Sequence, residues 1–339
     1  MNAINRRHFL KFGTAAAAAT TLSACSGNQN STSIDTQLPI GSFGAEATAE
    51  EVTEGLDLNG KTALVTGCNS GIGYETMRVL ALRGAHVIGA GRTMEKARKA
   101  CDSVEGETTP VVLELSDFQS AADCAQTIKK MGPPIDMVIC NAGINTFGEL
   151  ELVDGIERIF RVNHLGHFVL VNRLLALQAL SENGRIVHVG SMSGYAQAPA
   201  MGIDFSNLRG EKEFDAGEAY GRSKLANALF SLQLAKDLQA TKITSNVIHP
   251  GLVLTNIARN APALLRKGFE WLGPMFAKTP AQGAATQVYV ATHPSLAGVS
   301  GAYFEDCNPV IVAGPHHIND EAMAEKLWEV SLEMTEGFV

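Results

Sequence analysis

The sequence has no excess of basic residues, no long apolar run and no paired-cysteine motif, and each absence excludes a class of protein. Its 27 basic and 35 acidic residues give a net charge of −8, which disfavours a nucleic-acid binder. No apolar stretch reaches the roughly 18–20 residues of a membrane-spanning helix. The six cysteines, at positions 25, 68, 101, 124, 140 and 307, form no CxxC and fit neither a zinc cluster nor a small disulfide scaffold. We therefore expect no metal site.

The 339 residues, 45% of them hydrophobic and 18% charged, are enough for one large domain with a sizeable core. From Lys61 onward, short β-branched runs alternate with segments of helical length, which is typical of βαβ units. The strands are predicted at 62–66, 85–90, 110–115, 135–140, 185–189, 243–248 and 301–304. Several are apolar on both faces, as in parallel sheets covered on both sides. We predict a single doubly wound, Rossmann-type α/β domain over residues 56–339, with a parallel sheet of about seven strands and helices on both faces.

The first 25 residues resemble an export signal rather than a folded segment. The run Asn-Arg-Arg-His-Phe-Leu-Lys at 5–11 is similar to a twin-arginine motif, and a short, mildly apolar stretch follows it. That stretch ends in Leu-Ser-Ala-Cys at 22–25, which resembles a lipobox with Cys25 as the lipid acceptor. We expect export by the twin-arginine machinery and lipid anchoring of Cys25 at a membrane surface on the periplasmic or cell-envelope face.

Residues 26–55 are rich in small and polar side chains and show no apolar periodicity. This composition predicts a flexible tether. Within it, Thr48 and Glu51 have the spacing of a capping box for one helical turn.

A glycine-rich run at 66–73, Thr-Gly-Cys-Asn-Ser-Gly-Ile-Gly, lies between the first strand and the first helix of the domain. Glycines allow a tight turn, and the N–H groups of a helix N-terminus attract a pyrophosphate. After the second strand, Arg92 stands where an NAD-binding protein would carry a carboxylate. Arg92 therefore favours NADP through a 2′-phosphate contact, with NAD and a merely solvated Arg92 as the alternatives.

Five motifs in order resemble the short-chain dehydrogenase/reductase family, and most closely its retinol dehydrogenase and WW-domain oxidoreductase branch. They are the glycine-rich run, Asn-Ala-Gly at 141–143, Asn-His-Leu-Gly-His-Phe at 163–168, Tyr-Gly-Arg-Ser-Lys at 220–224, and Ile-His-Pro-Gly at 248–251. The resemblance covers the chain from about Glu50 to its end. It implies that the cofactor is held by Gly67, Ser70, Gly71, Ile72, Gly73, Arg92, Glu114, Leu115, Asn141, Ala142, Gly143, Tyr220, Lys224, Pro250, Gly251, Val253 and Thr255.

Three positions depart from the family pattern. Glu114 stands where aspartate is usual, and Tyr74 stands where NADP-preferring relatives often have a basic residue. Gly190 replaces the first of a common serine pair, which leaves Ser191 as the catalytic candidate and Ser193 as the second choice.

Hydride transfer to a carbonyl requires a group that delivers a proton to the resulting alkoxide, and the reverse reaction requires a base. Tyr220 can serve both needs if a positive charge stabilises its phenolate. Lys224 lies one helical turn further on and supplies that charge. Ser191 would orient the substrate oxygen. The resemblance implies that Asn163 holds a water beside Lys224, which makes Asn163, Ser191, Tyr220 and Lys224 the catalytic set.

Two segments are candidates for the walls of a substrate cleft. One is the long loop 194–217, and the other is 257–276, an apolar stripe that could be a lid, ordinary core or a contact with lipid. Four histidines in the motifs, His164, His167, His188 and His249, are interpreted as core residues or as residues packed directly behind the site, because none has metal-ligand spacing. By family analogy, helices 163–179 and 219–238 are expected to pair across a homodimer interface.

Together these features predict an NADP(H)-dependent oxidoreductase that interconverts an alcohol and a carbonyl on a small apolar molecule. The main alternative is a catalytically idle exported lipoprotein scaffold that retains a bound nucleotide. An epimerase or dehydratase is a weaker one, because the chain ends soon after the seventh predicted strand.

Overall fold

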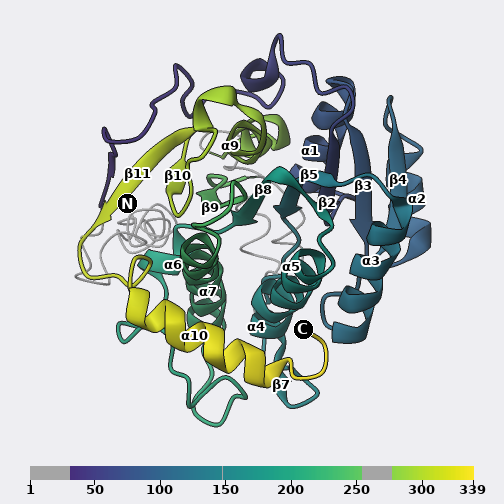
Figure 1. Cartoon of the computed structure of the whole chain (residues 1–339). Helices are drawn as coiled ribbons and strands as arrows, with labels where there is room; N and C mark the ends of the chain where they lie inside the picture. The colour runs from purple at the N-terminus through teal and green to yellow at the C-terminus, as the bar shows by residue number, and fades with distance from the viewer. Residues whose placement is uncertain (1–30, 147, 254–276) are drawn as a thin grey trace, which may run out of the picture.

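The computed structural model describes residues 31–146, 148–253 and 277–339. In that part of the chain, a nine-stranded sheet has the order β1-β11-β10-β9-β8-β5-β2-β3-β4 (Figure 1). The strands from β4 to β10 are parallel, as predicted. Their bounds are Thr62–Thr66 (β2), His86–Gly91 (β3), Thr108–Val112 (β4), Ile135–Cys140 (β5), Leu180–Val189 (β8), Thr244–His249 (β9) and Tyr303–Glu305 (β10). A small hairpin, Leu152–Val153 (β6) and Ile156–Glu157 (β7), lies apart from the sheet.

Helices cover both faces of the sheet, which confirms the predicted fold class. Helices α1 (Gly71–Leu82), α2 (Met94–Cys101) and α9 (Pro280–Thr292) pack on one face. Helices α3 (Phe118–Met131), α5 (Gly166–Ala176) and α7 (Ala216–Asp237) pack on the other, with α10 (Glu321–Met334) outside α7. Short turns complete the list: Glu51–Thr53 and Pro294–Leu296 are 3-10 turns, α4 is Arg158–Phe160, α6 is Ser193–Ala196, and Arg161–Leu165 is a π-helical turn. None of the helices described is long and apolar enough to cross a bilayer.

The sheet has two strands more than predicted, and both are antiparallel. Strand β11 (Asn308–Ala313) folds back on β10 through a tight turn in which Asp306 and Cys307 have positive φ angles of 49° and 62°. Two consecutive positive φ angles match the right-handed twist of a hairpin. Strand β1 (Ser31–Ile34) then pairs with β11 as the last strand of the sheet.

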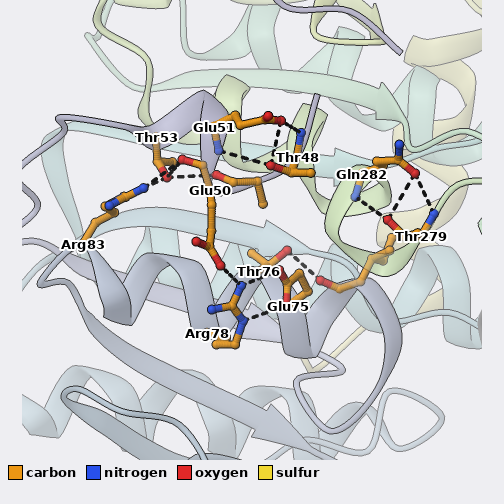
Figure 2. A network of polar contacts seen from close by, with 12 residues as sticks. Thr48, Glu50, Glu51, Thr53, Glu75, Thr76, Arg78, Arg83, Thr279 and Gln282 are labelled. Atoms are coloured by element: carbon orange, nitrogen blue, oxygen red, sulfur yellow. Dashed lines mark hydrogen bonds and ion pairs between the residues drawn. The ribbon is translucent and has the colours of Figure 1, made fainter. Parts of the chain in front are cut away.

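The flexible tether predicted for residues 26–55 needs correcting, because the part from Ser31 onward packs against the domain. Ala49 and Val52 are buried in the core beside α1 and α9. Figure 2 shows why this segment stays in place: Glu50 pairs with Arg78 of α1 at 2.5 Å, and Arg83 donates to the Glu50 carbonyl at 2.8 Å. The predicted capping box is present as well, with Thr48 N–H donating to Glu51 at 2.8 Å and Glu51 N–H to the Thr48 hydroxyl at 3.3 Å (Figure 2).

The expected pairing of α5 and α7 with a second copy stays a prediction; inside the chain, α10 packs against both helices. Every residue from 221 to 231 of α7 is buried within the single chain. Trp328 of α10 packs against Phe168 of α5 and Phe230 of α7, with ring centroids 5.0 and 5.8 Å apart. Ser331 of α10 bonds His164 at 2.8 Å. The faces of α5 and α7 that meet α10 are therefore part of the core of the single chain.

Candidate active site

The motif residues meet at the carboxyl ends of the parallel strands, on both sides of the place where the strand order reverses. Strands β2 and β5 lie side by side there, and the chain leaves them in opposite directions. Ligands of doubly wound folds bind in the crevice at such a switch point.

Tyr220 and Lys224 lie one turn apart in α7, and Ser191 comes directly after β8. The structure brings the three together: Tyr220 and Ser191 share a hydrogen bond, and the Lys224 Nζ is 5.7 Å from the centre of the Tyr220 ring. The Ser191 hydroxyl also accepts from the Ser193 N–H at 3.1 Å, which starts the short helix α6. Ser191 rather than Ser193 therefore faces the phenol.

Burial sets the proton affinities of this pair. It raises the pKa of the Tyr220 phenol to about 12, although the Ser191 hydrogen bond acts in the opposite direction. It lowers the pKa of Lys224 to about 8. The Lys224 ammonium donates to the carbonyl of Val189 at 2.8 Å, so its charge lies at the end of β8.

Asn163 lies in the π-helical turn Arg161–Leu165, and its side chain holds the loop after β5. Its Oδ1 accepts from the Ile144 N–H at 2.8 Å, and its Nδ2 donates to the Ile144 carbonyl at 2.9 Å. The Nδ2 also donates to the Ser223 hydroxyl at 2.9 Å, which ties the turn to α7. Gly143 fits closely here: a Cβ on it would lie 3.3 Å from the Asn163 Oδ1 and 3.6 Å from the Lys224 Nζ. The structure thus places Asn163 and Gly143 beside the lysine.

The glycine-rich turn is shaped to admit a phosphate. Gly67 and Gly71 have φ angles of 71° and 58°, and a Cβ on Gly73 would collide with Asn141 Nδ2 and the Gly67 carbonyl. Helix α1 starts at Gly71 without a side-chain cap from Ser70. By contrast, α2, α3, α7, α9 and α10 are each capped by a side-chain oxygen. These oxygens belong to Thr93, Asp117, Asp215, Thr279 and Asp320, respectively. The first N–H groups of α1 are therefore left for an anion.

The three cofactor residues predicted after β3 and β4, which are Arg92, Glu114 and Leu115, differ in what their side chains can contact. Arg92 is exposed just after β3, while Thr93 rather than Arg92 caps α2. The Glu114 carboxylate accepts from the N–H and hydroxyl of Ser116 at 3.0 and 2.8 Å. The side chain of Leu115 is 4% exposed and belongs to the core, which leaves only its backbone near the crevice.

Residues 250–253, directly after β9, lie against Lys278, α1 and α9. Gly251 has a φ of 84°, and a Cβ on it would lie 2.7 Å from Lys278 Cδ. Val253 pairs with Lys278 in an isolated bridge, and it meets Ile72 of α1 over Gly283 of α9. Pro250 precedes Gly251 in the same turn. Two sequence predictions in this region, Thr255 and the wall at 257–276, lie outside the described residues.

The sequence did not reveal the importance of Thr66, the last residue of β2. Its hydroxyl accepts from the N–H groups of Asn141 and Ala142, both at 2.9 Å, and lies 3.0 Å from His167 Nε2. Thr66 therefore links the glycine-rich turn with the Asn-Ala-Gly motif. A hydroxyl at the last position of a buried strand was the only available signal.

The loop 194–217, predicted as a cleft wall, is anchored on α7, on β7 and on the turn before α10. Arg222 donates to the Asn207 carbonyl at 3.1 Å, and the Glu157 N–H donates to Leu208 O at 3.1 Å. His317 lies 3.0 Å from the Ala200 carbonyl. The described residues contain no group of three or more His, Cys, Asp or Glu side chains that could hold a metal ion.

Comparison with known proteins agrees with this geometry. The family model for short chain dehydrogenases matches residues 61–203 and 203–264, and the model for the twin-arginine translocation signal matches residues 3–23. The chain belongs to the short-chain dehydrogenase/reductase family and carries a signal for twin-arginine export.

The chain is 38% identical to mouse "Retinol dehydrogenase 14" over 292 residues, which is 81% of this chain and 85% of that protein. It is 37% identical to the chicken "WW domain-containing oxidoreductase" over 301 residues, covering 85% and 71%. A crystal structure from Mycobacterium Paratuberculosis has a TM-score of 0.67 at 28% identity and covers 84% of this chain and 97% of that one. The angucycline C-6 ketoreductase LanV, solved with bound NADP, has a TM-score of 0.60 at 25% identity and covers 74% and 95%. The chain is thus an oxidoreductase by family, in the branch expected from its motifs.

Proposed function

We propose that this protein is an NADP(H)-dependent oxidoreductase that interconverts an alcohol and a carbonyl group on a largely apolar small molecule. The observation that carries the proposal is the meeting of Tyr220, Ser191 and Lys224 beside the uncapped start of α1. The apolar substrate class is supported by the similarity to retinol dehydrogenases, which are named for an apolar alcohol.

The residues present fit a nicotinamide dinucleotide. Gly67, Gly71 and Gly73 leave room for a pyrophosphate, and the first N–H groups of α1 point their partial positive charge toward it. Lys224 lies within reach of Gly143, where it would bind the nicotinamide ribose. When bound, the cofactor supplies or accepts the hydride that no side chain can carry.

The chain itself supplies the proton and the orientation. With its pKa near 12, the Tyr220 phenol keeps its proton at neutral pH and is ready to donate it to the oxygen of a carbonyl substrate. Ser191 shares a hydrogen bond with that phenol, so the two hydroxyls can hold one substrate oxygen between them. For the reverse reaction the phenol must lose its proton, and the ammonium of Lys224, charged below about pH 8, stabilises the phenolate.

Arg92 supports the choice of NADP, because it is exposed at the end of β3 and has no carboxylate partner among the described ion pairs. Replacing it, Arg92→Ala, is expected to weaken NADPH binding by about 10-fold or more, since a charge-assisted contact contributes roughly 1.5–3 kcal/mol. NADH binding should change less than threefold. Titration of nucleotide fluorescence on the purified protein measures both.

Arg98→Ala, at an exposed arginine of α2, is the matched control and should leave NADPH binding unchanged. If Arg92→Ala weakens NADPH and NADH equally, or neither, the assignment of Arg92 to the 2′-phosphate is wrong.

We further propose that Cys25 is lipidated after export and that the cofactor is loaded before it. The twin-arginine route carries folded proteins, and free nicotinamide nucleotides are scarce outside the cytoplasm, so a retained nucleotide fits both facts. Mass spectrometry of protein released from the envelope should find a lipid-modified Cys25 and bound NADP(H). A Cys25→Ala variant should be exported but released into the soluble fraction; unchanged membrane association would exclude anchoring through Cys25.

A further inference from the structure

Two polar side chains from neighbouring strands, Glu305 and His249, lie in a row next to the catalytic residues, and the proposed chemistry does not use them. In the parallel register, Glu305 of β10 lies opposite His249 of β9, and Val189 of β8 lies opposite Ile248. Gly190, the residue before Ser191, is therefore level with His249. Because side chains alternate along a strand, these positions share the face covered by α7.

Two tyrosines complete this group. Tyr195 of α6 donates its hydroxyl to Glu305 Oε1 at 2.8 Å, and its ring meets the Tyr303 ring edge-on at 6.1 Å. Tyr303 belongs to the same strand as Glu305 and is 6% exposed. A Cβ on Gly190 would lie 3.8 Å from Tyr303 Cε2, so the tyrosine ring lies beside the catalytic end of β8.

Two polar atoms in this group have no partner. Among the described residues, neither the Tyr303 hydroxyl nor His249 Nδ1 makes a hydrogen bond, and both atoms are buried. Leaving such an atom unpaired costs about 1–3 kcal/mol, so native proteins rarely keep one without a ligand or water. The Glu305 carboxylate accepts from Tyr195 and from Thr32, and a carboxylate has about four lone-pair sites, so further ones remain.

From this juxtaposition we propose that Glu305, Tyr303 and His249 form a second polar subsite that binds a hydroxyl group at the far end of the substrate. The inference rests on the proposed function and refines its substrate class to an elongated, largely apolar alcohol or carbonyl compound with a second hydroxyl. Strands β8 and β10 are two strand spacings apart, which puts the second hydroxyl about 10 Å from the reacting carbon.

The surrounding charges favour a neutral group over an ammonium ion. Lys278 lies next to the subsite, paired with Asp306 at 2.5 Å, and the Lys224 ammonium is on its other side. Burial raises the pKa of Glu305 and lowers that of His249 to about 4, so the subsite also favours uncharged partners. A hydroxyl can donate to Glu305 and accept from Tyr303 at once.

The test compares 1-octanol with 1,8-octanediol, which differ only in the second hydroxyl, as substrates of the NADP-loaded protein. The wild type should prefer the diol by about 10-fold or more in kcat/KM, the expected value of a buried hydroxyl contact. Glu305→Met and Tyr303→Phe should each reduce that preference to within about threefold while oxidation of 1-octanol changes little. Glu325→Gln, at an exposed glutamate of α10, is the matched control.

Binding of both alcohols, measured by calorimetry on the nucleotide-loaded protein, gives the same comparison without turnover. Tyr220→Phe should abolish oxidation of both alcohols but keep the binding preference, so failure of the catalytic proposal and failure of the subsite are distinguishable. Equal binding of the two alcohols by the wild type, or a preference that survives in both variants, overturns the subsite. Tighter binding of 8-amino-1-octanol than of the diol overturns its preference for a neutral group.

Discussion

Replacing Tyr220 by phenylalanine should lower kcat/KM for carbonyl reduction by at least about 100-fold, which corresponds to about 2.7 kcal/mol of transition-state stabilisation. The change removes a single oxygen from a buried ring, and that oxygen both carries the transferable proton and bonds Ser191. The position of Lys224, bonded to the Val189 carbonyl, does not depend on it. NADPH binding should therefore stay within about threefold of wild type, and steady-state kinetics with fluorescence titration separates the two effects.

Tyr289→Phe is the matched control, because it removes the hydroxyl of a fully buried tyrosine in α9 that lies among Phe43 and His293 rather than at the site. Its turnover should equal that of wild type. If Tyr220→Phe keeps full turnover, the phenol is not the proton donor. If neither wild type nor variant turns over any alcohol or aldehyde while NADPH still binds, the idle scaffold that retains a nucleotide becomes the better account.

The sequence allowed the candidate site residues to be assigned to particular strands and helices, because each motif is local. Each motif ends a strand or starts a helix, and parallel strands bring their carboxyl ends to one edge. Once Gly67, Ser191 and Tyr220 were placed on their elements, their meeting followed from topology. The same rule explains why the seven parallel strands could be predicted, whereas the antiparallel strands β1 and β11 were not.

Strand β1 and the start of β4, at the two edges of the sheet, lack the sequence signals on which the strand prediction depended. Strand β1 reads Ser-Thr-Ser-Ile, all four side chains are exposed, and it is held by backbone pairing with β11. We predicted that β4 starts at Pro110, but the strand starts at Thr108. A proline is tolerated inside it because β4 is the other edge strand of the sheet. Helix α10 was not expected to cover α5 and α7, since its contacts join residues more than 90 positions apart, such as Trp328 with Phe230.

Side-chain partnerships over such distances were also beyond the sequence. The hydroxyl of Thr66, the Tyr195–Glu305 bond and the closure of Val253 over Gly283 each join segments whose register is set only by the folded sheet. None of them leaves a spacing that could be recognised in the chain.

Three fully buried histidines beside the site, His164, His167 and His188, should make the stability of the fold depend on pH. Burial lowers their pKa values to about 3, 4 and 3, so all three are neutral in the folded protein. In the neutral ring of His167, Nδ1 donates to the Asn163 carbonyl at 3.2 Å, because a carbonyl can only accept. The lone pair of Nε2 then accepts the Thr66 hydroxyl at 3.0 Å. A proton on Nε2 would remove this acceptor, and the Thr66 hydroxyl would be left with the Ile139 carbonyl at 3.3 Å.

Stability should therefore fall steeply in mild acid. In the unfolded chain these histidines titrate near their ordinary pKa of 6.5, so below that pH the unfolded state binds protons that the folded state does not, and unfolding becomes easier as pH falls. By pH 4.5 each histidine should lower the free energy of unfolding by on the order of 2–3 kcal/mol, and three together approach the whole free energy of unfolding of a typical domain.

Denaturant unfolding between pH 7.5 and 4.5 measures how steeply the free energy of unfolding falls with pH. His188→Gln should reduce this slope by about one proton, whereas His86→Gln, at a partly exposed ring bonded to Thr109, should leave it unchanged. A free energy of unfolding that stays constant from pH 7 to pH 5 would show that the three rings are not buried in the neutral form. The hydrogen bonds assigned to neutral His167, with Thr66 and with Asn163, would then be wrong.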